Sequence, residues 1–286
     1  MSVGTADEAT LPPHVARRFG DVGRRRRPFA SSWGTASVRG PRRNENEDAC
    51  DQRDGRSFAV ADGMGGRPGG AAAAATAVTV LLDHLRRSSS PTDWQAIVAR
   101  TNHAVRERAT LDGIERSGAA IAAIHCSASG VTVLHLGDVR VYRLRHGTPE
   151  QLTTDHNVAE QLARDDINPA RLGLRAGELA ALTGYLGDED SATDFAVRGL
   201  SVLDGDRLVA CTDGVHRHLD ETVWQAIDSL DDRAAAALVV DAALRAGGTD
   251  DATALVLSLG FDDDVRSDFH SDVHGDVHDD TGGIWR

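Results

Sequence analysis

The strands and helices predicted for this 286-residue chain do not alternate, and their order limits the possible folds. Short apolar runs typical of strands fall at the start, middle and end of the sequence, with two helical pairs between them. A parallel sheet needs regular alternation, so the order predicts an α+β fold with antiparallel sheets and outer helices. The expected strands are 33–38, 58–61, 119–126, 131–136, 139–145, 150–152, 207–211 and 253–259, and the expected helices are 71–87, 93–109, 220–229 and 232–246.

Both ends of the chain are polar. Residues 1–28 include a run of four arginines at 24–27, and residues 261–286 are acidic and rich in histidine. Such segments bury too little apolar surface to fold, so we expect a flexible arm and a flexible tail around a domain at 29–260. The alternatives are an arginine contact with a membrane surface or acidic partner, and a metal site on one helical face of the tail. That face would carry His270, His274 and His278.

One internal segment has weak periodicity. Residues 157–192 mix Asp, Gly and Arg, and we interpret them as an irregular, partly helical insert on the surface.

Charge and composition exclude several classes of function. The net charge of −13 disfavours non-specific binding to nucleic acid, which needs an excess of basic residues. No apolar run reaches the ~18 residues of a membrane-spanning helix, and the N-terminus lacks the apolar core of a secretory signal. The three cysteines have neither paired nor metal-type spacing, so we expect reduced thiols in a cytoplasmic protein. They are Cys50, Cys126 and Cys211.

Acidic residues recur next to predicted strands, often beside glycine. An isolated Asp-Gly is usually an ordinary turn, but recurrence at strand ends favours a common site. Converging carboxylates repel one another unless a cation compensates, and oxygen ligands select hard cations such as Mg²⁺, Mn²⁺ or Ca²⁺. Two such ions ~4 Å apart can activate water and clamp a phosphoryl group. The acids are Asp62, Asp138, Asp213 and Asp250, with Glu47 and Asp48 as a fifth group.

Six motifs in order carry a family resemblance. They resemble the metal-dependent protein phosphatases of type 2C in their bacterial form, over roughly residues 33–260. Each motif is weak alone, but six in the right order are specific. The motifs are RNENED at 43–48, ADGMGG at 61–66, GDVRVY at 137–142, LTTDH at 152–156, CTDG at 211–214 and GGTDDAT at 247–253.

The resemblance implies a fold and a set of metal ligands. The fold would be a four-layer α-β-β-α sandwich of two antiparallel sheets with a metal site at one end, and the insert would be the family's flap. The cofactors would be two core Mn²⁺ or Mg²⁺ ions, with Asp62 bridging them. The equivalents of the core ligands are Asp62, Gly63 through its carbonyl, Asp213 and Asp250; Asp48 and Glu47 would act through water, and Asp138 would help to hold a third ion.

The implied activity is hydrolysis of phosphoserine and phosphothreonine in proteins, opposing Ser/Thr kinases. A hydroxide bridging the two ions would attack phosphorus in one step, without a phospho-enzyme. Arg43 would bind the phosphate, since its planar fork suits two oxygens; the alternative is a surface arginine. Met64 replaces a candidate acid of eukaryotic members, and we expect His156 to orient a loop. We also expect a monomer.

Three departures from the family pattern affect these expectations. The usual Gly-Thr-Thr stretch is replaced at 117–120 by Ser-Gly-Ala-Ala, and Val139 replaces a serine, which puts the third ion in question. Asp251 replaces an asparagine, and its carboxylate would either tighten metal binding or face water.

Two other functions compete with the phosphatase. A pseudophosphatase would keep the fold as a regulatory binding module, but such members typically lose metal aspartates, and all are present here. A phosphatase of the anti-sigma-factor pathway would normally carry a fused sensor domain, which we do not expect in this sequence.

Overall fold

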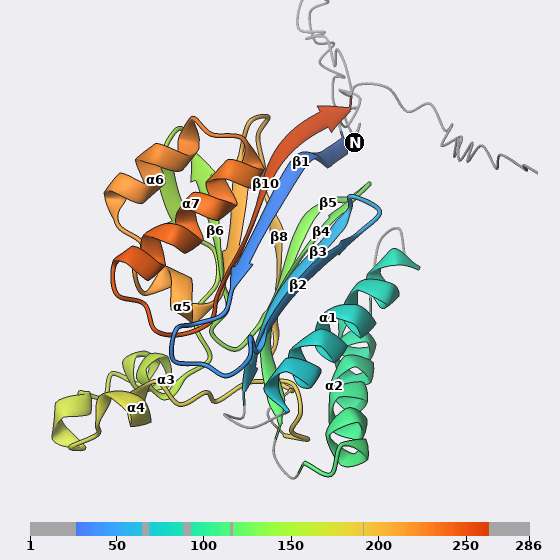
Figure 1. The fold of residues 1–286 in the computed structure, drawn as a ribbon. Helices are drawn as coiled ribbons and strands as arrows, with labels where there is room; N and C mark the ends of the chain where they lie inside the picture. The colour runs from blue at the N-terminus through green and yellow to red at the C-terminus, as the bar shows by residue number, and fades with distance from the viewer. Residues whose placement is uncertain (1–26, 65–68, 88–92, 115–116, 191, 263–286) are drawn as a thin grey trace, which may run out of the picture.

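Two five-stranded antiparallel sheets face each other, and helices cover both outer faces (Figure 1). This computed structural model describes residues 27–64, 69–87, 93–114, 117–190 and 192–262. The four layers are those that the sequence predicted, with α6 and α7 on one side and α1 and α2 on the other.

Sheet A has the strand order β1-β10-β9-β6-β7, and sheet B has the order β2-β3-β4-β5-β8. The strands of sheet A are β1 (Arg27–Val38), β6 (Arg140–Arg145), β7 (Thr148–Gln151), β9 (Arg207–Cys211) and β10 (Ala252–Asp262). Those of sheet B are β2 (Asp48–Arg53), β3 (Ser57–Met64), β4 (Gly118–Ser127), β5 (Gly130–Leu136) and β8 (Ala196–Leu200). The helices are α1 (Gly70–Arg86), α2 (Trp94–Leu111), α3 (Val158–Arg164), α4 (Ala176–Leu179), α5 (Asp213–His216), α6 (Glu221–Asp228) and α7 (Asp232–Arg245), with a 3₁₀ turn η1 at Pro169–Arg171.

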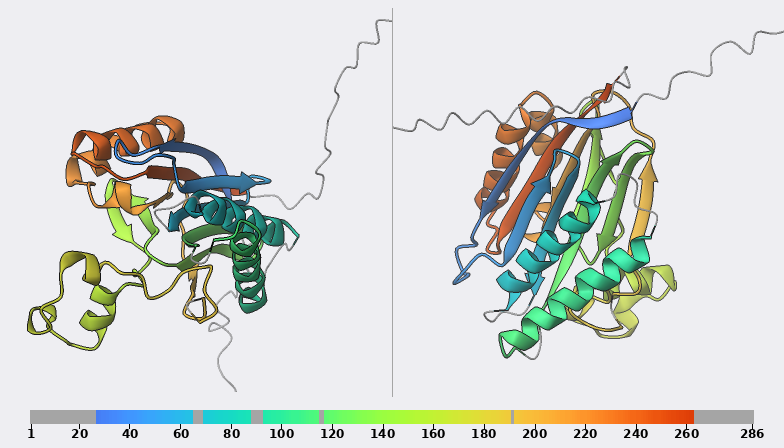
Figure 2. Two further views of the ribbon diagram at one scale, coloured as in Figure 1. Left: turned by 60° about the horizontal axis from the view of Figure 1, so that its bottom comes forward. Right: turned by 90° about the vertical axis from the view of Figure 1, so that its right-hand side faces the viewer.

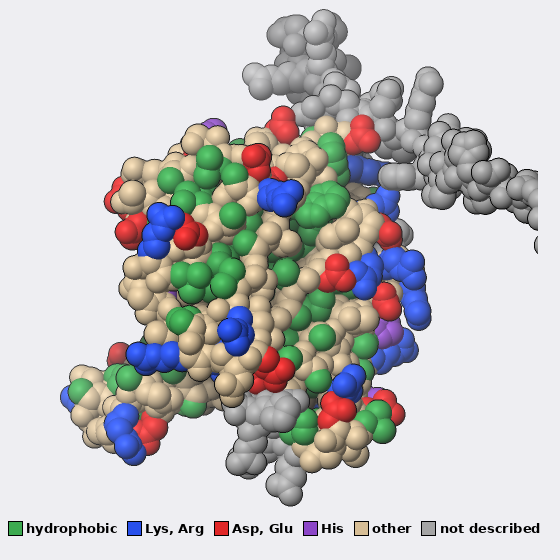
Figure 3. Space-filling view, in the orientation of Figure 1, with side chains coloured by type: hydrophobic (Ala, Val, Ile, Leu, Met, Phe, Trp, Pro, Cys, Tyr) green, Lys and Arg blue, Asp and Glu red, His purple; other side chains and the backbone are tan. Residues whose placement is uncertain are grey.

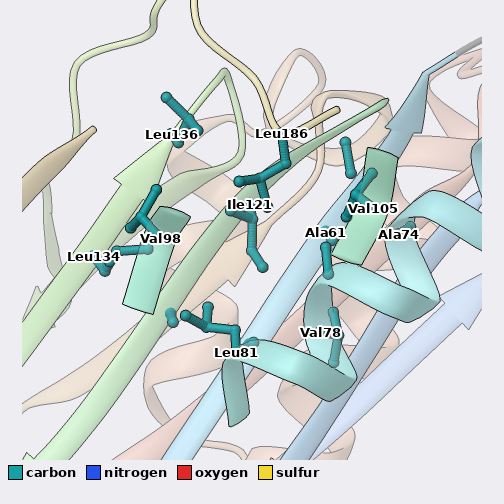
Figure 4. Packing of buried hydrophobic residues seen from close by; sticks show 14 of the residues in the cluster. Ala61, Ala74, Val78, Leu81, Val98, Val105, Ile121, Leu134, Leu136 and Leu186 are labelled. Atoms are coloured by element: carbon teal, nitrogen blue, oxygen red, sulfur yellow. The ribbon is translucent and has the colours of Figure 1, made fainter. Parts of the chain in front are cut away.

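Three apolar clusters hold the layers together. Phe58, Ile124 and Leu208 belong to the cluster between the sheets. A second cluster packs α1 and α2 on sheet B, where Leu81 and Val98 point from the helices toward the strands (Figure 4). A third packs α6 and α7 on sheet A. Burial at about 25 cal/mol per Å² makes these contacts the main stabilising term of such a fold.

Most predicted elements are confirmed to within a few residues, partly because aspartates mark helix starts. The carboxylate of Asp93 accepts the N–H of Ala96 at 2.9 Å, and Asp231 caps α7 in the same way. Such a cap is worth roughly 1 kcal/mol. The hairpin turn is shorter than predicted: His146 and Gly147 both have positive φ, and β7 begins immediately afterwards.

Some boundaries and two strands were not predicted. β1 begins at Arg27, six residues before the expected strand and inside the expected arm. β2 and β8 went unrecognised because β2 carries four polar residues in six and β8 is a mostly exposed edge strand. β3 also runs past the expected end at residue 61, so Asp62 lies within the strand.

The insert is partly helical, as predicted. α3, η1 and α4 form a lobe that projects from the sandwich near one end of the sheets (Figure 2). Its first helix is capped by Asn157, whose side chain accepts the N–H of Glu160 at 2.9 Å.

The expected arm up to residue 26 and the histidines of the tail lie outside the described residues, while β10 extends to Asp262. On the face that Figure 3 shows, described basic side chains are scattered among acidic ones. No described helix combines the length and the apolar character needed to cross a membrane.

Candidate active site

Asp48 and Asp62 lie side by side at one end of sheet B, because they are paired directly between β2 and β3. Sheet A reaches the same place, since Thr212, just after β9, donates its hydroxyl to Asp48 Oδ2 at 2.9 Å. The other carboxylate oxygen, Asp48 Oδ1, is buried and has no hydrogen-bond partner among the described residues. A buried oxygen without a donor indicates a position for a ligand or solvent.

Asp213 and Asp250 approach this end from sheet A. Asp213 is the first residue of α5, which follows β9, and Asp250 lies just before β10. β9 and β10 are neighbours in the sheet, and the N–H of Thr212 donates to the carbonyl of Thr253 at 3.0 Å. The fold therefore brings together acids that are more than 100 residues apart in sequence.

The acids are close enough to perturb one another. Burial raises the pKa of Asp62 well above its usual range, and the charges of Asp48 and Asp213 raise it further. Burial is also the main reason that the pKa values of Asp48 and Asp138 rise to about 7. Uncompensated buried carboxylates are unfavourable, and oxygen donors prefer hard divalent cations, so this set of residues fits such a cation.

These carboxylates do not form a closed metal shell. Within the described ranges, no group of three or more His, Cys, Asp or Glu side chains is arranged to hold a metal ion. Two acids instead contact arginines: Arg43 Nη2 lies 2.5 Å from Asp250 Oδ1, and Arg217 Nη2 lies 2.7 Å from Asp213 Oδ2. The arginines thus balance part of the negative charge.

Arg43 lies among the acids of the site and is not a surface arginine remote from them. Besides Asp250, its guanidinium contacts Glu47 Oε2 at 3.1 Å, and its side chain is 36% exposed. Glu47 is buried, and its Oε1 is so close to α1 that a Cβ at Gly70 would lie 2.6 Å from it. Burial is the main cause that raises the pKa of Glu47.

Gly63 is required by close packing of the backbone. A Cβ at this position would lie 2.2 Å from the carbonyl oxygen of Gly70 and 2.5 Å from that of Glu47. The N–H of Gly63 donates to the same Glu47 carbonyl at 3.1 Å. Any larger residue would push β3, α1 and the segment before β2 apart. The absence of a side chain at Gly63 therefore permits a close approach of backbone to backbone.

Asp138 lies in the middle of the β5–β6 connection, and the charge of Asp213 raises its pKa. His216 contacts its backbone carbonyl through Nε2 at 3.0 Å. Two hydrogen bonds join the preceding Gly137 to His156. The backbone N–H of Gly137 donates to His156 Nδ1 at 3.2 Å, and the backbone N–H of His156 donates to the carbonyl of Gly137 at 2.7 Å. These bonds agree with a loop-orienting role for His156. Val139 is fully buried between the sheets, so it provides no polar group near Asp138.

Asp251 does not face water, which was one of the two expectations for it. Its Oδ1 accepts the backbone N–H of Gly40 and its Oδ2 accepts that of Glu47, both at 2.8 Å, and the residue is 3% exposed. This carboxylate holds the segment that carries Arg43 and Glu47 against the start of β10.

Three contributors were not recognised from the sequence: Thr212, His216 and Arg217. Thr212 belongs to the CTDG motif, but only the aspartate of that motif was predicted to act at the site. Arg217 is four residues after Asp213, a spacing that places two side chains on one helical face, but the short helix α5 was not predicted. No local signal marks His216 as a partner of Asp138.

Comparisons with known proteins agree with this geometry. Residues 41–258 match the family described as Protein phosphatase 2C. The serine/threonine protein phosphatase PstP of Mycobacterium tuberculosis is 30% identical over 234 residues, which is 78% of this chain. The match covers 44% of that relative's own length.

Solved structures are similar over most of the described chain. The PPM Ser-Thr phosphatase MsPP of Mycobacterium smegmatis, in complex with cacodylate, is 33% identical with a TM-score of 0.71, covering 81% of this chain and all of that one. The catalytic domain of PstP in complex with two manganese ions is 27% identical with a TM-score of 0.66, covering 81% of this chain and 99% of that one. With a family match over most of its length and the same layered fold, this chain belongs to the protein phosphatase 2C family.

Proposed function

We propose that this protein hydrolyses phosphoserine and phosphothreonine in other proteins and depends on Mn²⁺ or Mg²⁺. The observation that carries the proposal is the convergence of Asp48, Asp62 and Asp213 at one end of the sandwich, where Asp48 Oδ1 has no partner among the described residues. The cacodylate complex of MsPP and the manganese complex of PstP support the same chemistry in relatives.

The acidic residues at the site would have different roles in metal binding, according to their positions. When bound, two divalent cations would lower the pKa of water and stabilise negative charge on the phosphoryl oxygens. Asp138 approaches from the β5–β6 connection and would serve a third ion. Glu47 and Asp48 are the outer acids, acting through water. The core ligands would be Asp62, the carbonyl of Gly63, Asp213 and Asp250.

Arg43 would bind the phosphoryl oxygens of the substrate. In this structure it contacts Asp250 and Glu47, and a cation held by Asp250 would compete with that ion pair. Because the arginine side chain is partly exposed, it can turn toward a substrate without leaving a buried cavity. Its planar guanidinium suits two oxygens of one phosphate, which lysine does not reproduce.

The partners would be phosphorylated proteins, including Ser/Thr kinases and the proteins they modify. We propose that the protein acts as a monomer in the cytoplasm, where its three reduced cysteines are in keeping with the compartment.

The test is hydrolysis of p-nitrophenyl phosphate and of a phosphothreonine peptide during a titration with Mn²⁺. We expect turnover that EDTA abolishes and that Asp62→Asn removes. Asp83→Asn is the matched control, because Asp83 lies on α1, near Arg53 at 3.6 Å, outside the acidic group.

Lack of turnover in a folded protein at millimolar Mn²⁺ would contradict the proposal and favour a regulatory binding module. Isothermal titration with Mn²⁺ then separates two causes of inactivity. Binding without turnover indicates a failure of substrate positioning, whereas absence of binding indicates that the acids do not form a metal site.

A further inference from the structure

A pocket of about 440 Å³ lies beside the active-site end, between sheet B and the insert. Its walls come from β5, β8, the segment that follows β7, and α3. None of the predicted metal ligands lines it. Its volume is within the range of pockets that enclose small molecules, roughly 300–1,000 Å³.

His135 lines this pocket and is an unusual residue because its ring is buried without hydrogen bonds to the described residues. It is 1% exposed, and both of its ring nitrogens lack a hydrogen-bond partner among the described residues. Burial lowers its pKa to about 3, so at neutral pH the uncharged ring offers one donor and one acceptor. Leaving such groups unpaired costs about 1–3 kcal/mol each. The nearest aromatic neighbour is His156, with ring centroids 4.7 Å apart.

The charged groups of the pocket are two arginines and one glutamate. Arg164 and Glu160 come from α3, and Arg198 comes from β8. Arg198 donates to the carbonyl of Leu152 at 3.3 Å but is 3.9 Å from Glu150, and its side chain is 55% exposed. Arg164 has no salt-bridge partner within the described residues. The pocket therefore has an excess of one positive charge.

The remaining wall consists of apolar side chains together with Thr153 and Thr154. Val133 and Leu152 belong to the cluster between the sheets, and Ala196 is paired with His135 across β5 and β8. A ligand here would meet apolar side chains on one side and cationic or imidazole groups on the other.

We propose that this pocket binds a small organic anion with an apolar body. Its acidic group pairs with Arg164 and Arg198, and its body packs on Val133, Leu152 and Ala196. The ligand bridges the insert and sheet B. Because His156 also bonds to Gly137, next to Asp138, a bound ligand would affect catalysis. This effect on catalysis rests on the proposed function. Binding itself does not.

The experiment measures binding of 8-anilino-1-naphthalenesulfonate, an anion with an aromatic body, by fluorescence titration of the full chain. We expect saturable binding of one equivalent. The uncharged analogue N-phenyl-1-naphthylamine should bind at least about tenfold more weakly, a difference of roughly 1.4 kcal/mol. Neither readout requires catalytic activity or a metal, so failure here is distinct from failure of the phosphatase proposal.

Variants locate the binding. Ala196→Phe fills the pocket and should abolish saturable binding, whereas Val197→Phe is the matched control because adjacent strand residues face opposite sides. Arg198→Gln should weaken the anion about tenfold without affecting the neutral analogue, and Arg171→Gln on the same insert should change neither. Circular dichroism confirms that each variant is folded.

Three results would overturn the proposal. They are the absence of saturable binding to the wild-type protein, binding that persists in folded Ala196→Phe, and equal affinities for the charged and neutral probes. The Arg198→Gln variant keeps the proposal testable if Ala196→Phe does not fold, because Arg198 is half-exposed and its loss leaves no cavity.

Discussion

Two buried groups of charges in this protein differ in how completely they are compensated. In the first, Asp232 at the start of α7 faces Arg207 of β9, and both residues are almost fully buried. Asp232 also accepts hydrogen bonds from the hydroxyls of Ser32, at 2.5 Å, and Ser258, at 2.8 Å. The remaining Nη1 of Arg207 donates to the carbonyl of Ile227.

The acids at the end of the sandwich are different. Burial raises the pKa of Asp62, and the negative charges of four other aspartates raise it further. Asp48 keeps an oxygen without a partner among the described residues. A fully paired buried charge serves the fold, whereas an unpaired group stores electrostatic energy that a bound cation can release. The contrast separates a structural ion pair from a binding site.

The largest expected effect is on activity at the acidic group of the candidate active site. Asp62→Asn removes the charge that the two cations would share. We expect kcat/KM to fall by on the order of 10³–10⁴, equivalent to roughly 4–5.5 kcal/mol of transition-state stabilisation. Steady-state kinetics with a phosphothreonine peptide measures this. An unchanged rate would show that the acidic group is not the catalytic centre.

The next effect concerns stability at the compensated group. Arg207→Met leaves Asp232 charged and buried, and we expect the free energy of unfolding to fall by about 3–5 kcal/mol in urea denaturation. The double variant Arg207→Met, Asp232→Leu should recover much of this loss. The exposed ion pair of Arg245 and Asp241 is the control, and Arg245→Met should cost less than about 1 kcal/mol. Equal losses of unfolding free energy in Arg207→Met and Arg245→Met would show that the buried ion pair is no more important for stability than the exposed one.

The adjacent residues Asp250 and Asp251 test the same difference between a binding residue and a structural one. Asp251→Asn keeps one acceptor for two backbone N–H groups, so we expect a loss of about 1–3 kcal/mol in unfolding free energy, with Mn²⁺ binding retained. Asp250→Asn should instead leave the metal-free stability nearly unchanged and eliminate most stabilisation by Mn²⁺. Thermal unfolding with and without Mn²⁺ compares both variants. Reversed outcomes would exchange the roles of the two residues.

The last prediction is a pH dependence of stability in the metal-free protein. The pKa values of Asp48 and Asp138 rise from 3.8 in the unfolded reference to about 7, so between these limits the folded state binds more protons. Stability contributed by this difference is therefore present at low pH and declines as pH rises toward 7. We therefore expect the free energy of unfolding in urea of EDTA-treated protein to decrease as the pH rises from 4 to 7.

The double variant Asp48→Asn, Asp138→Asn is the control for this dependence. Its unfolding free energy should vary less between pH 4 and 7 than that of the wild-type protein. Saturating Mn²⁺ should also flatten the wild-type profile, because a bound cation favours the ionised carboxylates. A wild-type profile that rises with pH in the absence of metal would contradict the sign of these shifts.

The fold was largely predictable because its signals are local. The apolar runs of β4, β5, β9 and β10 and the Ala- and Leu-rich helices have their own periodicity, and aspartate caps mark where several helices begin. β2 was missed since its side chains are half-buried and polar, and only its pairing with β3 makes it a strand.

The candidate site was predictable to a smaller degree. Asp62, Asp213 and Asp250 stood out by their position beside apolar runs, and their convergence followed from the layered fold. The neighbouring Asp251 was indistinguishable from a ligand in the sequence. Its role as a clamp depends on the N–H groups of Gly40 and Glu47, which are over 200 residues away.

By itself, the sequence determined the layers and the acidic residues, because periodicity and motif spacing are properties of neighbouring residues. Only the tertiary structure decided which carboxylates are paired. Asp232 meets its serines, Asp250 meets Arg43, and His135 is left with unpaired nitrogens through contacts between distant segments. The energy of a buried charge depends on all the groups around it, and those groups are assembled only when the chain folds.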